Sequence, residues 1–277
     1  MISGGGGAGP ESETPARVGL GEEVFIWRAE LDRTGSELES LTALLSASER
    51  ERADRFHFER DRRRFLAARG MLRKLLSGYT GVSPQELEFT YGPQGKPSLA
   101  SDGAGSGVEF NVSHSNGVAL FAFTCGATVG VDIEFIRSDI DCTELATSVF
   151  SPWERAELER LPATLRNEAF FACWTRKEAY IKALGGGLSV PLHRFDVSLT
   201  PGGPARLLRD RGDPNATQRW VMDDIDAGPG YRAALVVKRP GAKPRFFEWG
   251  NSRPLPFDLR PSLAARGKCP PAGKTLP

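Results

Sequence analysis

Two acidic side chains stand two residues apart in the segment GVDIEFI. Asp132 and Glu134 occur in an otherwise apolar run over 127–136 whose alternation is typical of a β-strand. Residues two apart in a strand point to the same face, so the carboxylates lie side by side while the apolar residues between them take the other face. Neighbouring carboxylates repel one another unless a cation lies between them. Taken alone, the pair is equally compatible with a solvated strand face.

A second group of reactive side chains lies in the segment FFACWTRKEAYIKAL, which we interpret as a helix. Trp174, Glu178 and Lys182 follow one another at i,i+4 spacing and therefore share one face. Glu178 and Lys182 alone are compatible with a simple surface ion pair. Together with Asp132 and Glu134, Glu178 makes an oxygen-only ligand set suited to Mg²⁺, which completes its shell with water and substrate phosphate. The combination indicates chemistry at a phosphate group.

The elements that must position these residues fall into two groups of similar order, helices and then strands. The first has a strand at 24–31, helices near 36–45, 48–58 and 60–78, and strands at about 86–91, 108–113 and 117–124. The second has a strand at 127–136, helices near 140–149, 152–161 and 167–184, and strands at about 194–199, 218–225 and 231–237. We expect an α+β fold of two comparable halves that meet near residue 125, although no repeat of individual residues is visible.

Local signals mark two of the helix ends. Ser151 and Glu154 form a capping box, with Pro152 at the first helical position. Gly185 to Gly187 end the long second helix, because glycine readily adopts the left-handed conformation that closes a helix.

The two ends of the chain differ in composition from the part between them. Residues 1–20 are rich in Gly, Pro, Ser and Glu, and we expect this segment to be disordered. The halves would then occupy 21–125 and 126–239, with the metal site in the second. Residues 240–277 form a Pro-rich tail in which Phe246, Phe247 and Trp249 suggest some packing.

Composition excludes some classes of partner. The 277 residues are 40% hydrophobic and carry a net charge of +1, so no overall field draws the chain to nucleic acid or to a membrane. The sequence shows neither an export signal nor an apolar run long enough to span a bilayer. The four cysteines, at 125, 142, 173 and 269, form no CxxC pair and fit free thiols in a cytoplasmic protein.

Four segments together resemble a known family. GVDIE at 130–134 and WTRKEAYIK at 174–182 look like the two signature motifs of Sfp-type 4'-phosphopantetheinyl transferases, the surfactin synthetase-activating type. GKP at 95–97 and NVSHS at 111–115 also resemble family segments, and all four occur in the family's order. The resemblance covers roughly residues 24–238.

The resemblance implies a fold, a reaction and a metal. The fold would be two similar α/β halves related by a pseudo-twofold axis, with coenzyme A in the cleft between them. Asp132, Glu134 and Glu178 would hold Mg²⁺, for which Mn²⁺ can substitute, and Lys182 would lie beside the phosphates. Glu178 would take the proton of a carrier-protein serine, directly or through water. The products would be the holo acyl or peptidyl carrier protein of fatty-acid, polyketide or peptide synthesis and adenosine 3',5'-bisphosphate.

Coenzyme A needs cationic partners, and the sequence offers several. Ten Lys and Arg residues lie between positions 50 and 74, a run that is also typical of a solvated helix face. The residues that the resemblance assigns to coenzyme A are Arg52, Arg64, Gly95, Lys96, Pro97, Ser113, His114, Lys177 and Lys182. Glu49 departs from the pattern, because surfactin-type members carry lysine there.

Two other functions fit part of the pattern. The same carboxylates would serve a metal-dependent hydrolase that cleaves the coenzyme A pyrophosphate with water and needs no carrier protein. The Arg-rich helix would alternatively serve a binding module for nucleic acid or an acidic protein, although the near-neutral charge counts against nucleic acid. Because one chain holds both halves, we expect a monomer.

Overall fold

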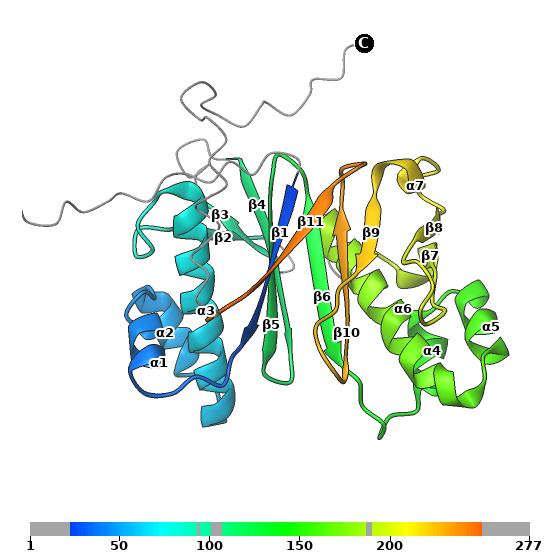
Figure 1. The fold of residues 1–277 in the computed structure, drawn as a ribbon, viewed down its shortest axis with the longest axis horizontal. Coiled ribbons are helices and arrows are strands. Elements are labelled where there is room, and N and C mark those ends of the chain that lie inside the picture. Colours follow the sequence, from blue (N-terminus) through cyan, green and yellow to red (C-terminus); the bar gives the residue numbers. More distant parts are fainter. Residues whose placement is uncertain (1–22, 93–94, 101–106, 187–189, 251–277) are drawn as a thin grey trace, which may run out of the picture.

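Two β-sheets form the middle of the molecule, and each is covered on its outer side by one long helix (Figure 1). This computed structural model describes residues 23–92, 95–100, 107–186 and 190–250. The N-terminal segment expected to be disordered and residues 251–277 of the Pro-rich tail lie outside these ranges. The α+β class predicted from the sequence is confirmed.

The first sheet has the strand order β11-β1-β5-β4. Its strands are β1 (Glu23–Glu30), β4 (Val108–Ser115), β5 (Val118–Cys125) and β11 (Lys243–Glu248). Strand β5 is antiparallel to both β1 and β4, whereas β11 runs parallel to β1. The helices of this half are α1 (Gly35–Thr42), α2 (Ala47–Ala53) and the 22-residue α3 (Glu59–Thr80), which packs on the sheet. A small hairpin of β2 (Phe89–Tyr91) and β3 (Pro97–Leu99) completes this half.

The second sheet has the order β6-β10-β9 and is antiparallel throughout. Its strands are β6 (Val129–Phe135), β9 (Val221–Asp224) and β10 (Tyr231–Val237). The helices are α4 (Cys142–Val149), α5 (Pro152–Arg160), the 22-residue α6 (Ala163–Leu184) and the short α7 (Ala216–Arg219). A 3-10 turn at Leu192–Arg194 leads into a hairpin of β7 (Phe195–Val197) and β8 (Leu207–Asp210).

A shared apolar core joins the two sheets. Val24 and Ile26 of β1 belong to the same buried cluster as Val131 and Ile133 of β6. The prediction that Val131 and Ile133 take the face opposite Asp132 is therefore confirmed. Burying these faces against each other turns the acidic face of β6 toward α6.

The two halves repeat one local device. Ser46 begins α2 and Ser151 begins α5, each with a capping box to a glutamate three residues later. Glu49 and Glu154, the box partners, are both buried and both bind a cation from the long helix of their half. Glu49 accepts a hydrogen bond from Arg73 of α3 at 2.7 Å. A glutamate in place of the lysine expected at this position therefore anchors a helix.

Lys177 of α6 makes the corresponding contact in the second half. Its side chain is fully buried, and its Nζ donates to both carboxylate oxygens of Glu154 at 2.7 Å and to the Phe195 carbonyl at 2.8 Å. Burial of both charges stabilises the fold only because each has its partner. This lysine therefore fastens α6 to α5 and β7.

Most of the predicted elements are present, and three short strands were not expected. The capping box at Ser151 and the left-handed closing glycine Gly185 are confirmed. Strands β3, β8 and β11 are the additions; each has six residues or fewer, too short for a clear period. Strand β11 forms despite Pro244 because it stands at the edge of its sheet, and Phe247 stacks on Trp27 with ring centroids 4.8 Å apart.

Two further expectations concern cysteines and membranes. Cys142 and Cys173 are free thiols, as expected, but Cys125 takes part in a disulfide, so the expectation of a free thiol is wrong at that position. Cys269 lies outside the described residues. Among the described helices, none combines the length and apolar character needed to cross a bilayer.

Replacing Glu154 by Ala should strongly destabilise the protein, by about 3–5 kcal/mol in the free energy of unfolding. The buried Lys177 ammonium group would then have lost the carboxylate that balances its charge. Denaturant unfolding followed by circular dichroism measures the loss. Glu159→Ala, at an exposed position of the same helix, is the control and should change stability little. Equal stability of the two variants would contradict the anchoring role.

Candidate active site

The acidic face of β6 lies directly against α6 because residue 130 has no side chain. A Cβ atom on Gly130 would stand 2.1 Å from the Ala179 carbonyl oxygen and 2.5 Å from the Ala183 nitrogen. Such distances are far inside van der Waals contact, so this close approach of strand and helix requires glycine. The contact brings Asp132 beside Lys182.

Asp132 is the most enclosed member of the acidic group. Its side chain is 4% exposed, and its Oδ1 accepts hydrogen bonds from Lys182 Nζ at 2.6 Å and from Ser113 Oγ at 2.8 Å. Lys182 also donates to Ser113 Oγ at 3.0 Å, which closes a triangle of three elements. The second oxygen, Oδ2, is buried without a hydrogen-bond partner in the described part of the chain. A buried carboxylate oxygen in this state is available to a ligand.

Glu134 and Glu178 share the electrostatic field of Asp132. Burial raises the pKa of Glu134, and the charge of Asp132 raises it further, against hydrogen bonds from Ser115 and Trp174. Burial raises the pKa of Glu178 to about 7, with the charges of Asp132 and Glu134 acting in the same direction. Glu178 Oε1 is also buried and has no hydrogen-bond partner among the described residues. Burial and the charge of Asp132 thus both disfavour ionisation of Glu134 and Glu178.

The cluster has the donor chemistry of a divalent-cation site without being closed into a cage. Within the described ranges, no group of three His, Cys, Asp or Glu side chains is arranged to hold a metal ion. Asp132 is instead engaged by the Lys182 ammonium group. Two unpartnered buried oxygens and a shared excess of negative charge nevertheless fit a hard cation.

Two further predicted residues, Lys96 and His114, lie near Lys182. Lys96 donates to the Lys182 carbonyl oxygen at 2.8 Å, and burial lowers its pKa. His114 lies close enough to Lys182 to be affected by its charge. Burial lowers the pKa of His114 most, and the positive charge of Lys182 lowers it further. Gly95 precedes Lys96 with a φ of 77°, and Pro97 begins β3. The GKP segment therefore reaches from the first half to the end of α6.

A pocket of about 650 Å³ opens beside Glu134. Arg60, Arg64 and Arg137 contribute its cationic side chains. Its apolar lining comes from Phe135, Ile140, Leu145, Val149, Phe170, Phe171 and Trp174. Arg64 is held by Asp32, with hydrogen bonds of 2.7 and 2.8 Å. The pocket combines an apolar interior with charged groups from both halves, as ligand sites often do.

The remaining predicted residues lie elsewhere. Arg52 lines a separate pocket with Arg55 and Phe56, and its guanidinium lies 5.5 Å from the centroid of the Phe65 ring. Lys177 is not brought to the site, because its ammonium group is enclosed by Glu154 and Phe195 on another side of α6. We correct its assignment accordingly and leave Lys177 out of the site.

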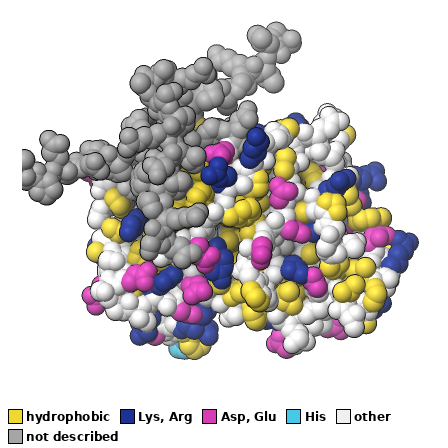
Figure 2. Space-filling model, in the orientation of Figure 1, with side chains coloured by type: hydrophobic (Ala, Val, Ile, Leu, Met, Phe, Trp, Pro, Cys, Tyr) yellow, Lys and Arg dark blue, Asp and Glu magenta, His cyan; other side chains and the backbone are white. Residues whose placement is uncertain are grey.

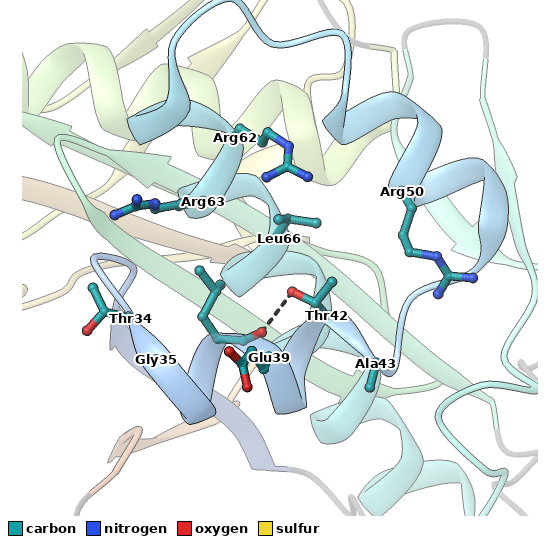
Figure 3. A pocket seen from close by; sticks show the side chains of 10 residues that line it. Thr34, Gly35, Glu39, Thr42, Ala43, Arg50, Arg62, Arg63 and Leu66 are labelled. Atoms are coloured by element: carbon teal, nitrogen blue, oxygen red, sulfur yellow. Dashed lines mark hydrogen bonds between the residues drawn. The ribbon is translucent and has the colours of Figure 1, made fainter.

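The arginine run between positions 50 and 74 serves several purposes. Arg50, Arg62 and Arg63 lie around a pocket of about 570 Å³ between α1 and α3, whose apolar side includes Leu66 (Figure 3). Arg62 also pairs with Asp54, and Arg73 is buried. Basic and acidic side chains are interspersed over the described part of the face in Figure 2. The run is therefore not a single continuous basic surface.

Comparison with known proteins places this arrangement in a family. Residues 128–236 match the 4'-phosphopantetheinyl transferase superfamily, and residues 30–125 match the family described as 4'-phosphopantetheinyl transferase, N-terminal. The 4'-phosphopantetheinyl transferase HetI of Nostoc sp. is 39% identical over 230 residues, which cover 83% of this chain and 94% of HetI. The chain belongs to the 4'-phosphopantetheinyl transferase superfamily. The recognition drawn from GVDIE and WTRKEAYIK is confirmed, and with it the assignment as a transferase.

The chain is also similar to a second curated transferase and to a solved structure. The 4'-phosphopantetheinyl transferase psf-1 of Bacillus pumilus is 32% identical over 207 residues, covering 74% of this chain and 84% of psf-1. Among solved structures, the Chronobacterium ammoniagenes ACPS-CoA complex is 24% identical and covers 40% of this chain and 95% of that chain, with a TM-score of 0.31.

Sequence reasoning did not single out three residues that pack around the acidic cluster: Asn111, Ser115 and Gly130. Ser115 donates to Glu134 Oε2 at 2.9 Å, and Asn111 accepts from the Val131 amide at 2.8 Å. Their signal is the alternation of polar residues in NVSHS, which places Asn111, Ser113 and Ser115 on one strand face. Gly130, the first residue of GVDIE, could also have been noticed, because a glycine inside a strand indicates a close approach of another backbone.

Replacing Gly130 by Ala should push β6 away from α6. We expect a loss of about 1–3 kcal/mol in the free energy of unfolding, the range for overpacked interiors, together with a fall in transferase rate. Gly92→Ala is the control, since a Cβ there would meet nothing closer than the Lys96 carbonyl oxygen at 3.8 Å. A Gly130→Ala protein with unchanged melting temperature and rate would show that the close approach is dispensable.

The raised pKa of Glu178 predicts a pH dependence of stability in EDTA. The folded protein holds this proton up to a pH of about 7, whereas the unfolded chain releases it near 4.5. The contribution of Glu178 to stability is therefore fully present below pH 4.5 and is lost as the pH rises through 7. The melting temperature of the wild type relative to Glu178→Gln should fall between pH 5 and pH 8, a span of about three units around these pKa values. A difference that does not change with pH would contradict the raised pKa.

Proposed function

We propose that the protein transfers the 4'-phosphopantetheine group of coenzyme A to a serine of an apo acyl or peptidyl carrier protein, in a Mg²⁺-dependent reaction. The products are the holo carrier protein and adenosine 3',5'-bisphosphate. The observation that carries the proposal is the pair of unpartnered buried oxygens, Asp132 Oδ2 and Glu178 Oε1, beside the Lys182 ammonium group. Both a divalent cation and a substrate phosphate find complementary groups there.

The cations around the cluster support binding of the phosphates of coenzyme A. Lys182 and Lys96 would approach the pyrophosphate, with His114 as a hydrogen-bond donor beside them and Ser113 holding Lys182 and Asp132 in place. Arg64 would supply a guanidinium, which matches phosphate by its planar fork. Arg52, Gly95 and Pro97 complete the proposed set of coenzyme A residues.

Asp132, Glu134 and Glu178 would hold the metal ion. Bound there, Mg²⁺ or Mn²⁺ would offset negative charge on the pyrophosphate and stabilise the charge that develops on the leaving phosphate. The proposal is supported by the three carboxylates sharing one electrostatic field, in which two buried oxygens have no hydrogen-bond partner among the described residues. Lys182 would add a second positive charge at the same phosphates.

The chemistry assigned to the protein itself is proton transfer and positioning. The carrier serine oxygen would form a bond to the phosphorus that carries the pantetheine arm, and the bond from that phosphorus to the bridging oxygen would break. Glu178 would accept the serine proton, directly or through water, a contribution of about 10²- to 10⁴-fold. The bridging oxygen would leave with the adenosine bisphosphate.

The pocket beside Glu134 is the proposed place for the pantetheine arm. Its apolar lining suits the methyl and methylene groups of the arm, and its position next to the carboxylates leads from the phosphates toward solvent. Both sides of the site come from one chain, so the active cytoplasmic species would be a monomer.

The decisive experiment mixes the protein with coenzyme A, Mg²⁺ and an apo carrier protein and weighs the carrier by intact mass spectrometry. We expect the carrier to gain one phosphopantetheine group, with no gain in EDTA or on a serine-to-alanine carrier. Asp132→Ala and Glu178→Ala should lower the rate more than about 100-fold. Glu159→Ala, at an exposed position of α5, is the control and should retain the rate.

The same experiment distinguishes the two other functions. Cleavage of coenzyme A with no change in the carrier mass would favour the hydrolase and contradict the proposed transfer to a carrier protein. Tight binding of carrier or nucleic acid without any product would favour a binding module. Full activity of both carboxylate variants would overturn the site while leaving the family membership intact.

A further inference from the structure

The two halves meet where strand β6 of one sheet lies along strand β4 of the other. Strand β6 stands at the end of its sheet, with β10 as its hydrogen-bonded neighbour, so alternate amide groups of β6 point away from β10. Amide groups exposed along a sheet edge need partners, and in most proteins another backbone strand or water supplies them.

Here the partners are side chains of β4. The Val131 amide donates to Asn111 Oδ1 at 2.8 Å and the Phe135 amide donates to Ser115 Oγ at 3.0 Å. Between them, the Ile133 amide lies 3.4 Å from Ser113 Oγ. The three contacts follow one another at a spacing of two residues on both strands. They form a ladder in which side chains replace the backbone groups of a neighbouring strand.

The same hydroxyl groups reach past the β6 backbone to its carboxylates. Ser113 donates to Asp132 and Ser115 donates to Glu134 Oε2 at 2.9 Å. Each serine therefore accepts from one β6 amide and donates to the carboxylate of the residue before it. Asn111 accepts from an amide alone, because residue 130 is glycine.

We infer that this ladder positions the acidic site, and that Ser115 is the positioning residue of Glu134. The backbone contact fixes the height of Ser115 along β6, and its hydroxyl hydrogen then fixes the rotation of the Glu134 carboxylate. The inference rests on the proposed function for its metal, but the ladder itself is independent of any ligand.

The chain offers a matched pair of variants. Ser115→Ala and Asn111→Ala each leave one β6 amide without its side-chain acceptor, so each variant should lose one hydrogen bond of the ladder. Ser115→Ala additionally removes the donor to Glu134, whereas Asn111→Ala leaves both carboxylates with their hydroxyl partners. Ser115→Thr retains the hydroxyl and is the conservative rescue.

Amide hydrogen exchange followed by NMR tests the ladder without any metal. We expect the amides of Val131, Ile133 and Phe135 to be protected in the wild type. Ser115→Ala should speed exchange at Phe135 by about 10-fold or more and leave Val131 protected, and Asn111→Ala should do the reverse. Unprotected amides in the wild type would overturn the ladder, whatever the protein binds.

Mn²⁺ binding measured by electron paramagnetic resonance, without coenzyme A or carrier, tests the positioning. Ser115→Ala should weaken Mn²⁺ binding by about 10- to 100-fold, the usual effect of removing a partner of a metal ligand. Asn111→Ala should change it much less, and Ser115→Thr should restore it. Equal weakening in the two alanine variants would reduce Ser115 to a structural role and overturn the inference. A wild type that binds no Mn²⁺ would instead sink the proposed metal site, and with it the assignment of Ser115.

Discussion

The Lys182 ammonium group is the charge on which the site depends. Glu134 and Glu178 lie in the field of Asp132 at the joint between the sheets, and burial alone already disfavours ionisation of these two glutamates. Lys182 binds Asp132 and Ser113 at once, so it offsets part of the negative charge while joining α6 to β6 and β4. Burial, with the charges of Asp132 and Glu134 acting in the same direction, keeps the proton of Glu178 toward neutral pH even though Lys182 opposes it. A further cation at this cluster would relieve repulsion that already exists.

Buried ion pairs hold the long helices of the surrounding scaffold. Each half fastens its long helix through a glutamate that also caps a shorter helix, so the caps serve as anchors. Glu49 holds Arg73 in one half and Glu154 holds Lys177 in the other. Removing one partner of such a buried pair lowers the free energy of unfolding by far more than the intact pair adds to it. Loss of either partner would therefore destabilise the half that contains it. Both halves thus carry the same Ser-x-x-Glu cap, and in each the glutamate binds a cation from the long helix.

The sequence predicted the reactive groups because their spacing lies within single elements. Asp132 and Glu134 follow the period of a strand, and Glu178 and Lys182 follow that of a helix. Lys177 was assigned to the site because it is next to Glu178 in the sequence. Neighbouring residues of a helix are turned by about 100° around its axis, so the Lys177 side chain lies on a different face from Glu178 and Lys182. That turn was available in the sequence, and it places Lys177 among buried groups instead of at the phosphates.

What the sequence left out depends on which elements meet. Ser115 and Asn111 acquire roles only because β4 lies along β6, a contact between strands of different sheets that no local period encodes. Strand β11 pairs with β1 across more than 200 residues, and short strands of this kind have weak local signals. Arg52, Arg64 and His114 remain predictions as coenzyme A residues, since their roles concern a ligand and not the packing of the chain.

Under the proposed function, the contacts of Lys182 would couple metal binding to substrate binding. The Lys182 ammonium group is held by Asp132, the same carboxylate proposed as a metal ligand. A metal ion at Asp132 would take this partner from Lys182 and leave its ammonium group to a substrate phosphate. A pyrophosphate that attracts Lys182 would expose Asp132 in the same way. Each ligand would then lower the cost of binding the other, and by linkage the two effects on affinity would be equal in size.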